Sequence, residues 1–331
     1  MNSKKVAVVG AGIAGLHAAR RLQARGCSVR IFEKARAASG RVSTRRLDFG
    51  GFDHGAQYFT ARDSAFEACV QEWSARSVVE PWQGRVVSLR RGDVERESSP
   101  PTRWVGAPSM SAIARDLARG LEIEAETRIE TTRREGERWT LLSDAGIEFA
   151  GFDWLVVAVP APQAVPLLAA SAEFAMKAQG VRFLACHALM LALEAPLACD
   201  FDAAFVADSP LAWIARQASK PARDPSNGWL IHSTSEWSEA HLDLPSDRVI
   251  ELLRDAFSDA VGHRLPNTRG RAVHRWLFAR PVQSLWQELL WDERLGLGVC
   301  GDWLQGDRIE DAYLSAERLA RAMLLSDPLP R

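Results

Sequence analysis

The sequence predicts an α/β protein in which a discontinuous dinucleotide-binding domain is interrupted by a second, α+β domain built on an antiparallel sheet. Short, continuous apolar runs at 6–9 and 154–162 are typical of buried parallel strands. From 181 to 235 the pattern changes to longer alternating segments, which indicate antiparallel strands. We therefore assign residues 1–60, 104–161 and 272–331 to the nucleotide-binding domain, and 61–103 and 162–271 to the second domain.

The composition excludes several classes of partner. The 331 residues include 41 Lys and Arg against 42 Asp and Glu, so the chain carries no electrostatic footprint for nucleic acid or for an anionic membrane. The five cysteines are widely spaced, without a CxxC or a Cys/His cluster, which favours free thiols and no metal site. Because we find no signal-peptide pattern and no membrane-length apolar run, we expect a cytoplasmic protein.

The other elements follow from periodicity and from their stop signals. A long loop, laid along a ligand, is expected over 35–62, and Asp63 is expected to cap the helix that contains Phe66 and Trp73. The remaining predictions are helices over 13–25, near 110–119, near 246–260 and from Ile309 to Leu324, and strands over 28–34, near 121–125, 127–132 and 138–142, at 272–279 and at 297–302.

The stretch "VAVVGAGIAGL" has the G-x-G-x-x-G spacing of a dinucleotide site. Gly10 permits the tight turn, Gly12 lets a phosphate approach the backbone, and Gly15 lets the helix pack on the strand. A diphosphate then lies at the helix N-terminus, where free N–H groups favour an anion. Glu33 ends the second strand and is placed to accept hydrogen bonds from the ribose hydroxyls. NAD and FAD share this pattern, so the motif alone leaves the dinucleotide open.

Two later segments resemble the glutathione-reductase-type flavoprotein family and the amine oxidase superfamily within it. In "KARAASGRVSTRR" the family's Gly-Gly-Arg becomes Ser39-Gly40-Arg41, and the resemblance implies that Arg41 contacts the pyrophosphate. "DHGAQYFTARD" is similar to the segment that runs beside the isoalloxazine. "RIETT", around Ile129, looks like the adenine-side strand.

The segment "VCGDWLQGDRIEDAYLSAERLA" resembles the C-terminal flavin motif of this superfamily. The resemblance implies that Asp302 meets the ribityl chain and that the Ile309 amide meets the flavin N1/O2 edge. It therefore implies FAD, and noncovalent FAD, since Cys300 lies too close to the Gly-Asp pair to be the family's covalent cysteine. The expected cofactor contacts are Gly10, Gly12, Ile13, Ala14, Gly15, Glu33, Lys34, Arg41, Ala56, Gln57, Ile129, Asp302, Arg308 and Ile309.

Simple amines are not the favoured substrate. Arg308 stands where amine oxidases commonly place one ring of their aromatic pair, and the chain has only two tyrosines. The family's lysine near flavin N5 has no clear equivalent, because the strand in which we would expect it, 181–194, contains His187 and no lysine.

Several blocks together are similar to the bacterial renalases, over nearly the whole chain. The resemblance implies an FAD-dependent oxidase that converts dihydro-NAD(P), reduced at nicotinamide C2 or C6, to NAD(P)+ by hydride transfer to flavin N5, while O2 becomes H2O2. An amine oxidase and a flavin-binding redox sensor without turnover remain the alternatives. The blocks are "DHGAQYFTARD", "RWVGAPSMSAI", "SPLAWIARQASKPARD", "HSTSEWS", "HRWLFARP" and "CGDW".

Hydride transfer needs orientation and no proton removal, so we expect no catalytic acid or base, with His187 the one possible exception. Arg62 could meet a substrate phosphate or could equally be a surface arginine paired with Asp63, and Trp104 could be plain packing. His274 and Arg275 are expected to hold the domains together. The stretch 219–224 is expected to be a solvated turn whose basic residues could guide an anionic dinucleotide. The expected substrate contacts are Tyr58, Phe59, Thr60, Ala61, Arg62, Trp104 and His187.

Overall fold

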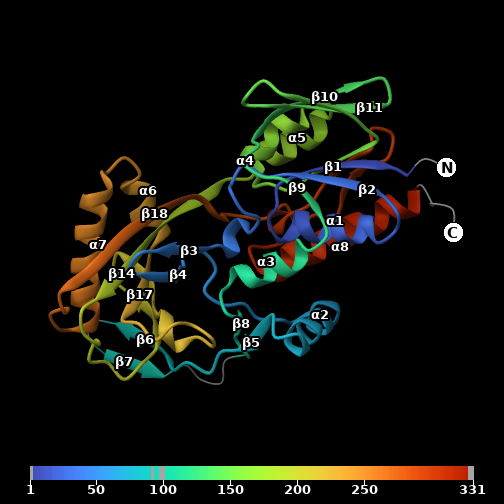
Figure 1. Ribbon diagram of the computed structural model, residues 1–331. Coiled ribbons are helices and arrows are strands. Elements are labelled where there is room, and N and C mark those ends of the chain that lie inside the picture. The colour runs from blue at the N-terminus through green and yellow to red at the C-terminus, as the bar shows by residue number, and fades with distance from the viewer. Residues whose placement is uncertain (1–2, 91–92, 97–100, 327–331) are drawn as a thin grey trace.

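The computed structural model describes residues 3–90, 93–96 and 101–326; the parts of the predicted domains at 1–2, 91–92, 97–100 and 327–331 lie outside this description (Figure 1). Its first layer is a six-stranded sheet of order β19-β20-β13-β1-β2-β9. Its strands are β1 Lys5–Val9, β2 Ser28–Phe32, β9 Glu122–Glu124, β13 Trp154–Val157, β20 Leu297–Val299 and the antiparallel edge strand β19 Leu290–Asp292. The predicted buried parallel strands are thus confirmed.

Helices cover one face of this sheet. α1 Ile13–Gln23, α2 Ser64–Ala75, α3 Ser111–Leu117 and α8 Ile309–Ser326 bury one apolar core that includes Leu16, Phe66 and Leu319. The predicted cap of α2 is confirmed, because the Asp63 carboxylate accepts from the amides of Ala65 (2.9 Å) and Phe66 (3.3 Å). α2 falls in the predicted second domain, yet it packs into this core.

The other face carries a small antiparallel sheet and short helices. The sheet joins β10 Ile129–Glu135, β11 Arg138–Ser143 and β12 Glu148–Phe152. Beside it lie α4 Ala161–Ala164, η2 Val165–Leu168 and α5 Ala172–Gln179. Trp139, Leu167 and Trp303 are among the side chains buried in this second core.

The second domain is built on a seven-stranded sheet of order β18-β14-β17-β16-β15-β6-β7. All neighbours are antiparallel except β15 and β6, which run parallel. α7 Ser246–Val261 covers one face of the sheet, with Leu253 and Phe257 in the same core as Trp229. The strands are β6 Val86–Arg90, β7 Asp93–Arg96, β14 Phe183–Leu193, β15 Ala203–Ala207, β16 Leu211–Arg216, β17 Gly228–Ser233 and β18 Thr268–Pro281, and α6 Ser235–Ala240 follows β17.

The prediction of one long loop over 35–62 is wrong, because a hairpin interrupts this segment. After η1 Gly40–Val42, the strands β3 Thr44–Leu47 and β4 Gly50–Asp53 pair antiparallel. Phe52 is buried against Ala188, Met190 and Leu230 of the seven-stranded sheet, and this burial stabilises the hairpin. The hairpin lies between the two large sheets (Figure 1). The pair β5 Val79–Pro81 and β8 Trp104–Gly106, with η3 Gln217–Ser219 and η4 Asp302–Leu304, completes the described elements.

Candidate functional site

A cavity of about 2290 Å³ is lined by both domains. It opens at the carboxyl ends of β1, β2 and β13, where Val9, Glu33 and Ala158 line it, and extends to Trp213 and Trp276 of the seven-stranded sheet. Pockets for single drug-sized ligands are roughly 300–1,000 Å³, so this cavity has room for a dinucleotide and a second molecule. The carboxyl ends of parallel strands are the usual place for such ligands.

The glycine turn has the shape that a diphosphate requires. Gly10 has a φ of +105°, which favours glycine, and a side chain on Gly12 would meet only open space. A Cβ on Gly15 would lie 1.9 Å from the Gly10 carbonyl oxygen, so only glycine lets α1 pack this close to the turn. Gly12 is the N-cap of α1 and its side of the turn faces the cavity. The N–H groups at this end are therefore available to an anion.

Glu33 fixes the turn from the neighbouring strand. One carboxylate oxygen accepts from the Ala11 amide and the other from the Ala35 amide, each at 2.8 Å. The side chain lines the cavity although the residue is only 7 % exposed. A charged acceptor that ties two backbone segments together holds the nucleotide end of the cavity in shape. Burial lowers the pKa of the adjacent Lys34, which also lines the cavity.

Arg41 and Asp302 meet across the other end of the cofactor region. The guanidinium donates two hydrogen bonds to the Asp302 carboxylate, at 2.6 and 2.7 Å, and a third to the Ala279 carbonyl at 3.1 Å. Both residues line the cavity, Arg41 from η1 and Asp302 from η4, which precedes α8. The amides of Asp307 and Arg308 donate to the Asp311 carboxylate at 3.1 and 3.0 Å, which fixes the turn that enters α8. Bidentate charge-assisted pairs of this kind hold their geometry well.

Most of the predicted cofactor residues gather in this cavity. Gly15 and Gln57 do not line it: Gly15 lies under the turn, and the Gln57 side chain bonds to the carbonyls of Asp53 and Gly55 and accepts from Lys220. The residues that do line it are Gly10, Gly12, Ile13, Ala14, Glu33, Lys34, Arg41, Ala56, Ile129, Asp302, Arg308 and Ile309. A phosphate-sized cradle, an acid at the end of β2 and a helix N-terminus at the far end fit a flavin dinucleotide.

Rings form the wall on the side of the second domain. His54 stacks on Trp276, with ring centroids 5.1 Å apart, and meets His274 edge-on at 4.9 Å. The His54 carbonyl accepts from the Trp276 indole at 2.8 Å and lies 3.1 Å from His232 Nε2. Burial lowers the pKa of both His54 and His232 to about 4, so both imidazoles are neutral at pH 7. We call His54, Trp213, His232, His274 and Trp276 the ring wall; all five line the cavity.

Of the contacts predicted to hold the domains together, the described part of the chain shows one for His274 and none for Arg275. His274 lines the cavity from the seven-stranded sheet and meets His54, which follows β4, edge-on at 4.9 Å. The next residue on β18, Arg275, donates to the Leu242 carbonyl within the second domain. The block "HRWLFARP" forms part of β18, and its sequence alone does not show which of its side chains face the cavity.

The predicted substrate contacts are also corrected, because none of them lines the cavity. After Ala56 the chain turns toward β8, where Phe59 and Trp104 exchange backbone hydrogen bonds of 2.9 and 2.8 Å. Tyr58 packs on Trp82 and Trp213. Thr60 and Ala61 continue in the same direction to Arg62, whose amide donates to Glu310 at 2.7 Å. Packing therefore explains this segment.

His187 has a structural role and does not face the cavity. It is 3 % exposed, its ring meets Trp237 edge-on at 5.7 Å, and its amide lies 3.0 and 3.1 Å from the hydroxyls of Ser233 and Ser238. Burial, followed by the charge of Arg275, lowers the pKa of His187 to about 4.

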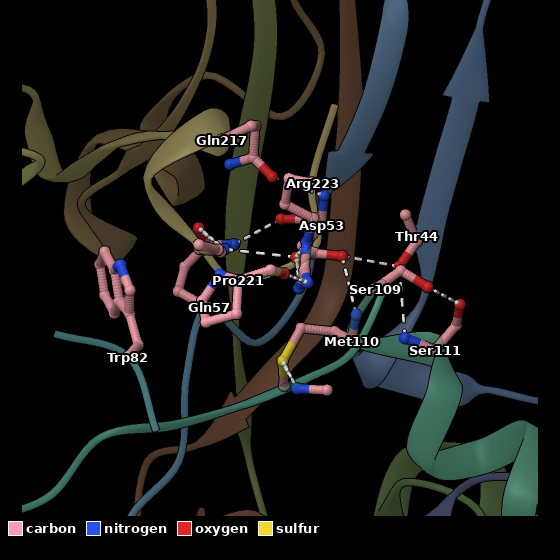
Figure 2. A network of polar contacts seen from close by, with 12 residues as sticks. Thr44, Asp53, Gln57, Trp82, Ser109, Met110, Ser111, Gln217, Pro221 and Arg223 are labelled. Carbon is pink, nitrogen blue, oxygen red and sulfur yellow. Dashed lines mark hydrogen bonds and ion pairs between the residues drawn. The ribbon is translucent and has the colours of Figure 1, made fainter. Parts of the chain in front are cut away.

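The turn predicted at 219–224 is present at Pro221 and Ala222, but the prediction that its basic residues are solvated is wrong. Figure 2 shows the polar cluster to which this stretch contributes, centred on Asp53. The Lys220 side chain is 0 % exposed, with Nζ 3.4 Å from an Asp53 oxygen and 3.1 Å from Gln57 Oε1. Arg223 donates to the same Asp53 oxygen at 2.7 Å. Two buried cations thus share one buried carboxylate.

The rest of the Asp53 cluster comes from three other segments. Gln217 Oε1 accepts from the Asp53 amide at 3.0 Å, and the other carboxylate oxygen accepts from the Thr44 hydroxyl (2.7 Å) and the Met110 amide (3.0 Å). Burial would raise the pKa of Asp53, but the charges of Lys220 and Arg223 outweigh it and hold this pKa at about 2. Burial lowers the pKa of Lys220 to about 8.

Two further features bear on the class of site. Among the described residues, no group of three or more His, Cys, Asp and Glu side chains is arranged to hold a metal ion. Within the same residues, no helix combines the length and the apolar character that crossing a membrane requires.

Comparison with known proteins agrees with this geometry. Residues 8–73 match the family described as NAD(P)-binding Rossmann-like domain. A hydroxyneurosporene desaturase from Cereibacter sphaeroides is 42 % identical over 71 residues, which are 20 % of this chain and only 14 % of the desaturase.

Solved structures share the fold over nearly the whole chain. A putative protoporphyrinogen oxidase from Exiguobacterium sp. 255-15 has a TM-score of 0.82 and 13 % identity, covering 99 % of this chain and 100 % of the other. A putrescine oxidase bound to putrescine has a TM-score of 0.72 and 12 % identity, covering 98 % and 99 %. At this identity the likeness shows the fold. Residues 103–324 match the family described as flavin containing amine oxidoreductase, and the chain therefore belongs to this family of FAD-dependent oxidoreductases.

Proposed function

We propose that this protein oxidises isomeric dihydro-NAD(P), reduced at nicotinamide C2 or C6, to NAD(P)+. When bound, FAD would supply the hydride acceptor and a route for two electrons, with protons from solvent, to O2, giving H2O2. The observation that carries the proposal is the chemistry of the ring wall and of the residues around it. It is supported by the resemblance to the bacterial renalases in several separate blocks of the sequence.

The second-domain side of the cavity favours an anion with a flat ring over a protonated amine. The ring wall consists of indoles and imidazoles, and the charged residue beside it is Arg45, while Arg46 and Arg275 also line the cavity but point to the opposite faces of their strands. Among the described residues that line the cavity on this side, none is a carboxylate. A cationic amine gains nothing from arginines, whereas a dinucleotide carries a diphosphate that they attract. A dihydropyridine ring can stack on indole and imidazole rings.

The protonation states suit hydride transfer. Moving a hydride from a dihydropyridine requires that the ring be oriented against the acceptor, and it requires no base. His54 and His232 are neutral at pH 7 and held by backbone contacts, so they act as rigid walls. In this proposal the chain binds and orients the substrate ring and excludes water from it.

FAD is proposed to be held noncovalently. Cys300 is fully buried and does not line the cavity, and burial raises the pKa of its thiol to about 12. Cys186 does line the cavity, but burial raises its pKa to about 12 as well, so neither is a thiolate near neutral pH.

Anaerobic stopped-flow absorbance tests the proposal. The purified holoprotein is mixed in turn with 2- and 6-dihydro-NAD, with ordinary 1,4-dihydro-NAD, and with a panel of primary and secondary amines. We expect rapid loss of the flavin band near ~450 nm with the 2- or 6-dihydro isomers alone, followed by H2O2 on admission of air. Bleaching by an amine would replace the proposal with an amine oxidase. Bleaching by none of these compounds would favour the redox sensor without turnover.

A further inference from the structure

Arg45 is a charged residue that lines the cavity together with the ring wall. It follows Thr44 on β3, and successive side chains of a strand point to opposite faces. Because Thr44 points to Asp53, Arg45 points to the other face, and it lines the cavity. Burial lowers the pKa of His54 and of His274, and the positive charge of Arg45 lowers both further. Across the hairpin Arg45 is paired with Phe52, which packs on Ala188, the residue paired with His274 in the seven-stranded sheet, so Arg45 lies on the side of the hairpin that faces the ring wall.

The Arg45 guanidinium is available to an anion. Within the part of the chain that the structure describes, it has neither an ion pair nor a hydrogen bond, and the residue is exposed. Arg41 and Arg308, which also line the cavity, are instead paired with Asp302 and with Glu310. Arg46 lies on the same face of β3 as Thr44, opposite to Arg45. Its positive charge helps to lower the pKa of Arg115 in α3. Arg45 alone of these combines an open guanidinium with the ring wall.

We propose that Arg45 binds a phosphate group of the substrate and thereby selects phosphate-bearing dihydronicotinamides over the riboside. This inference rests on the proposed function. In a nicotinamide nucleotide the 5′-phosphate is one sugar away from the ring, so a dihydropyridine ring against the ring wall would bring this phosphate toward Arg45, which lines the same cavity. The planar fork of a guanidinium matches two phosphate oxygens, and among the described residues that line this side of the cavity no carboxylate competes for it.

A truncation series measures the selection. The substrates are the 6-dihydro isomers of NAD, of nicotinamide mononucleotide and of nicotinamide riboside, with the holoprotein. We expect kcat/KM of the wild type to fall about tenfold or more between mononucleotide and riboside, because one charge-assisted contact is lost. In Arg45→Ala this difference shrinks to about twofold, and the loss for the mononucleotide appears mainly in KM. Arg45→Lys keeps part of the difference, and higher salt reduces it.

Arg271→Ala is the matched control, because Arg271 is an exposed arginine of β18 that does not line the cavity. It should behave as wild type with all three substrates. A second readout needs no turnover: titration of the holoprotein with NAD+, followed through the spectrum of the bound flavin, gives a Kd that should rise about tenfold in Arg45→Ala.

The outcomes separate the two proposals. Equal kcat/KM for mononucleotide and riboside in the wild type would overturn the phosphate contact while leaving the oxidase proposal standing. An equal loss for both substrates in Arg45→Ala would show a role in structure alone. If no dihydronicotinamide bleaches the flavin, the proposed function fails, and unchanged NAD+ binding in Arg45→Ala would overturn the phosphate site independently.

Discussion

Glu33 joins the end of β2 to the glycine turn through the amides of Ala11 and Ala35. We predict that Glu33→Ala weakens FAD binding roughly tenfold or more, because the turn loses a charged acceptor and the ribose loses its partner. Fluorescence titration of the apoprotein with FAD measures this change. Glu137→Ala, at an exposed residue that does not line the cavity, is the control. Equal FAD affinity in Glu33→Ala and wild type would remove Glu33 from the cofactor site.

His187 makes the stability of the folded protein depend on pH. Its folded pKa of about 4 lies below the ordinary value of 6.5, so the unfolded chain takes up a proton first as the pH falls. The contribution of His187 is therefore present above pH 6.5 and is lost as the pH falls toward 4. His187→Phe keeps a ring against Trp237. We predict that it lowers the slope of unfolding free energy against pH, between pH 4 and pH 6.5, by up to about 1.4 kcal/mol per pH unit.

Urea unfolding of the holoprotein at several pH values measures this slope. His263→Phe makes the same exchange at an exposed site and should leave the slope unchanged. A slope that His187→Phe leaves as steep as in the wild type would mean that another group carries the effect.

At the scale of elements, the Asp53 cluster fastens β4 to η3 and to the residues that follow it, and it fixes the backbone on either side of His54. We predict that Asp53→Asn destabilises the protein by about 3–5 kcal/mol, because it leaves Lys220 and Arg223 buried without a counter-charge. Lys220→Met should cost clearly less, since the pair of Arg223 and Asp53 remains. Equal losses for the two variants in urea unfolding would show that the charges do not act as one cluster.

The elements also show how far the sequence could be read. Strands with continuous or alternating apolar patterns, and helices with caps, were predicted correctly because their signals are local. The hairpin β3–β4 was missed because only Phe52 and Asp53 of β4 are buried, which leaves no alternation to recognise. Lys220 looked solvated because the residue that neutralises it, Asp53, is 167 positions away in the chain.

The candidate site divides in the same way. Glu33, Arg41, the start of α8 and Gly10 and Gly12 of the glycine turn belong to short motifs, and all of them line the cavity. The substrate side was misplaced, because Tyr58 to Arg62 follow Ala56 in the chain but turn away from the cavity to meet β8. The ring wall is assembled from β16, β17, β18 and the residue after β4. These segments are far apart in the sequence, so no local sequence pattern predicts that their rings lie together.

At the scale of the whole molecule, one cavity is lined by both large sheets, so its contents stabilise both. We predict that free FAD at one hundred times its Kd stabilises the apoprotein by about 2.7 kcal/mol and raises Tm in a single transition. Calorimetry of the apoprotein over a range of FAD concentrations measures this shift. Riboflavin, which lacks the diphosphate, is the control and should raise Tm less. Two separate transitions, with only one responding to FAD, would contradict the prediction.

The way in which the strands are distributed along the chain has a consequence for inheritance. The six-stranded sheet takes strands from Lys5–Val9 to Leu297–Val299, while the seven-stranded sheet takes strands from Val86–Arg90 to Thr268–Pro281. Neither sheet can therefore be moved to another protein as one uninterrupted stretch of gene. A single crossover between two relatives at any position from 91 to 267 would split both sheets at once, so replacing individual wall residues disturbs this fold less than exchanging long segments.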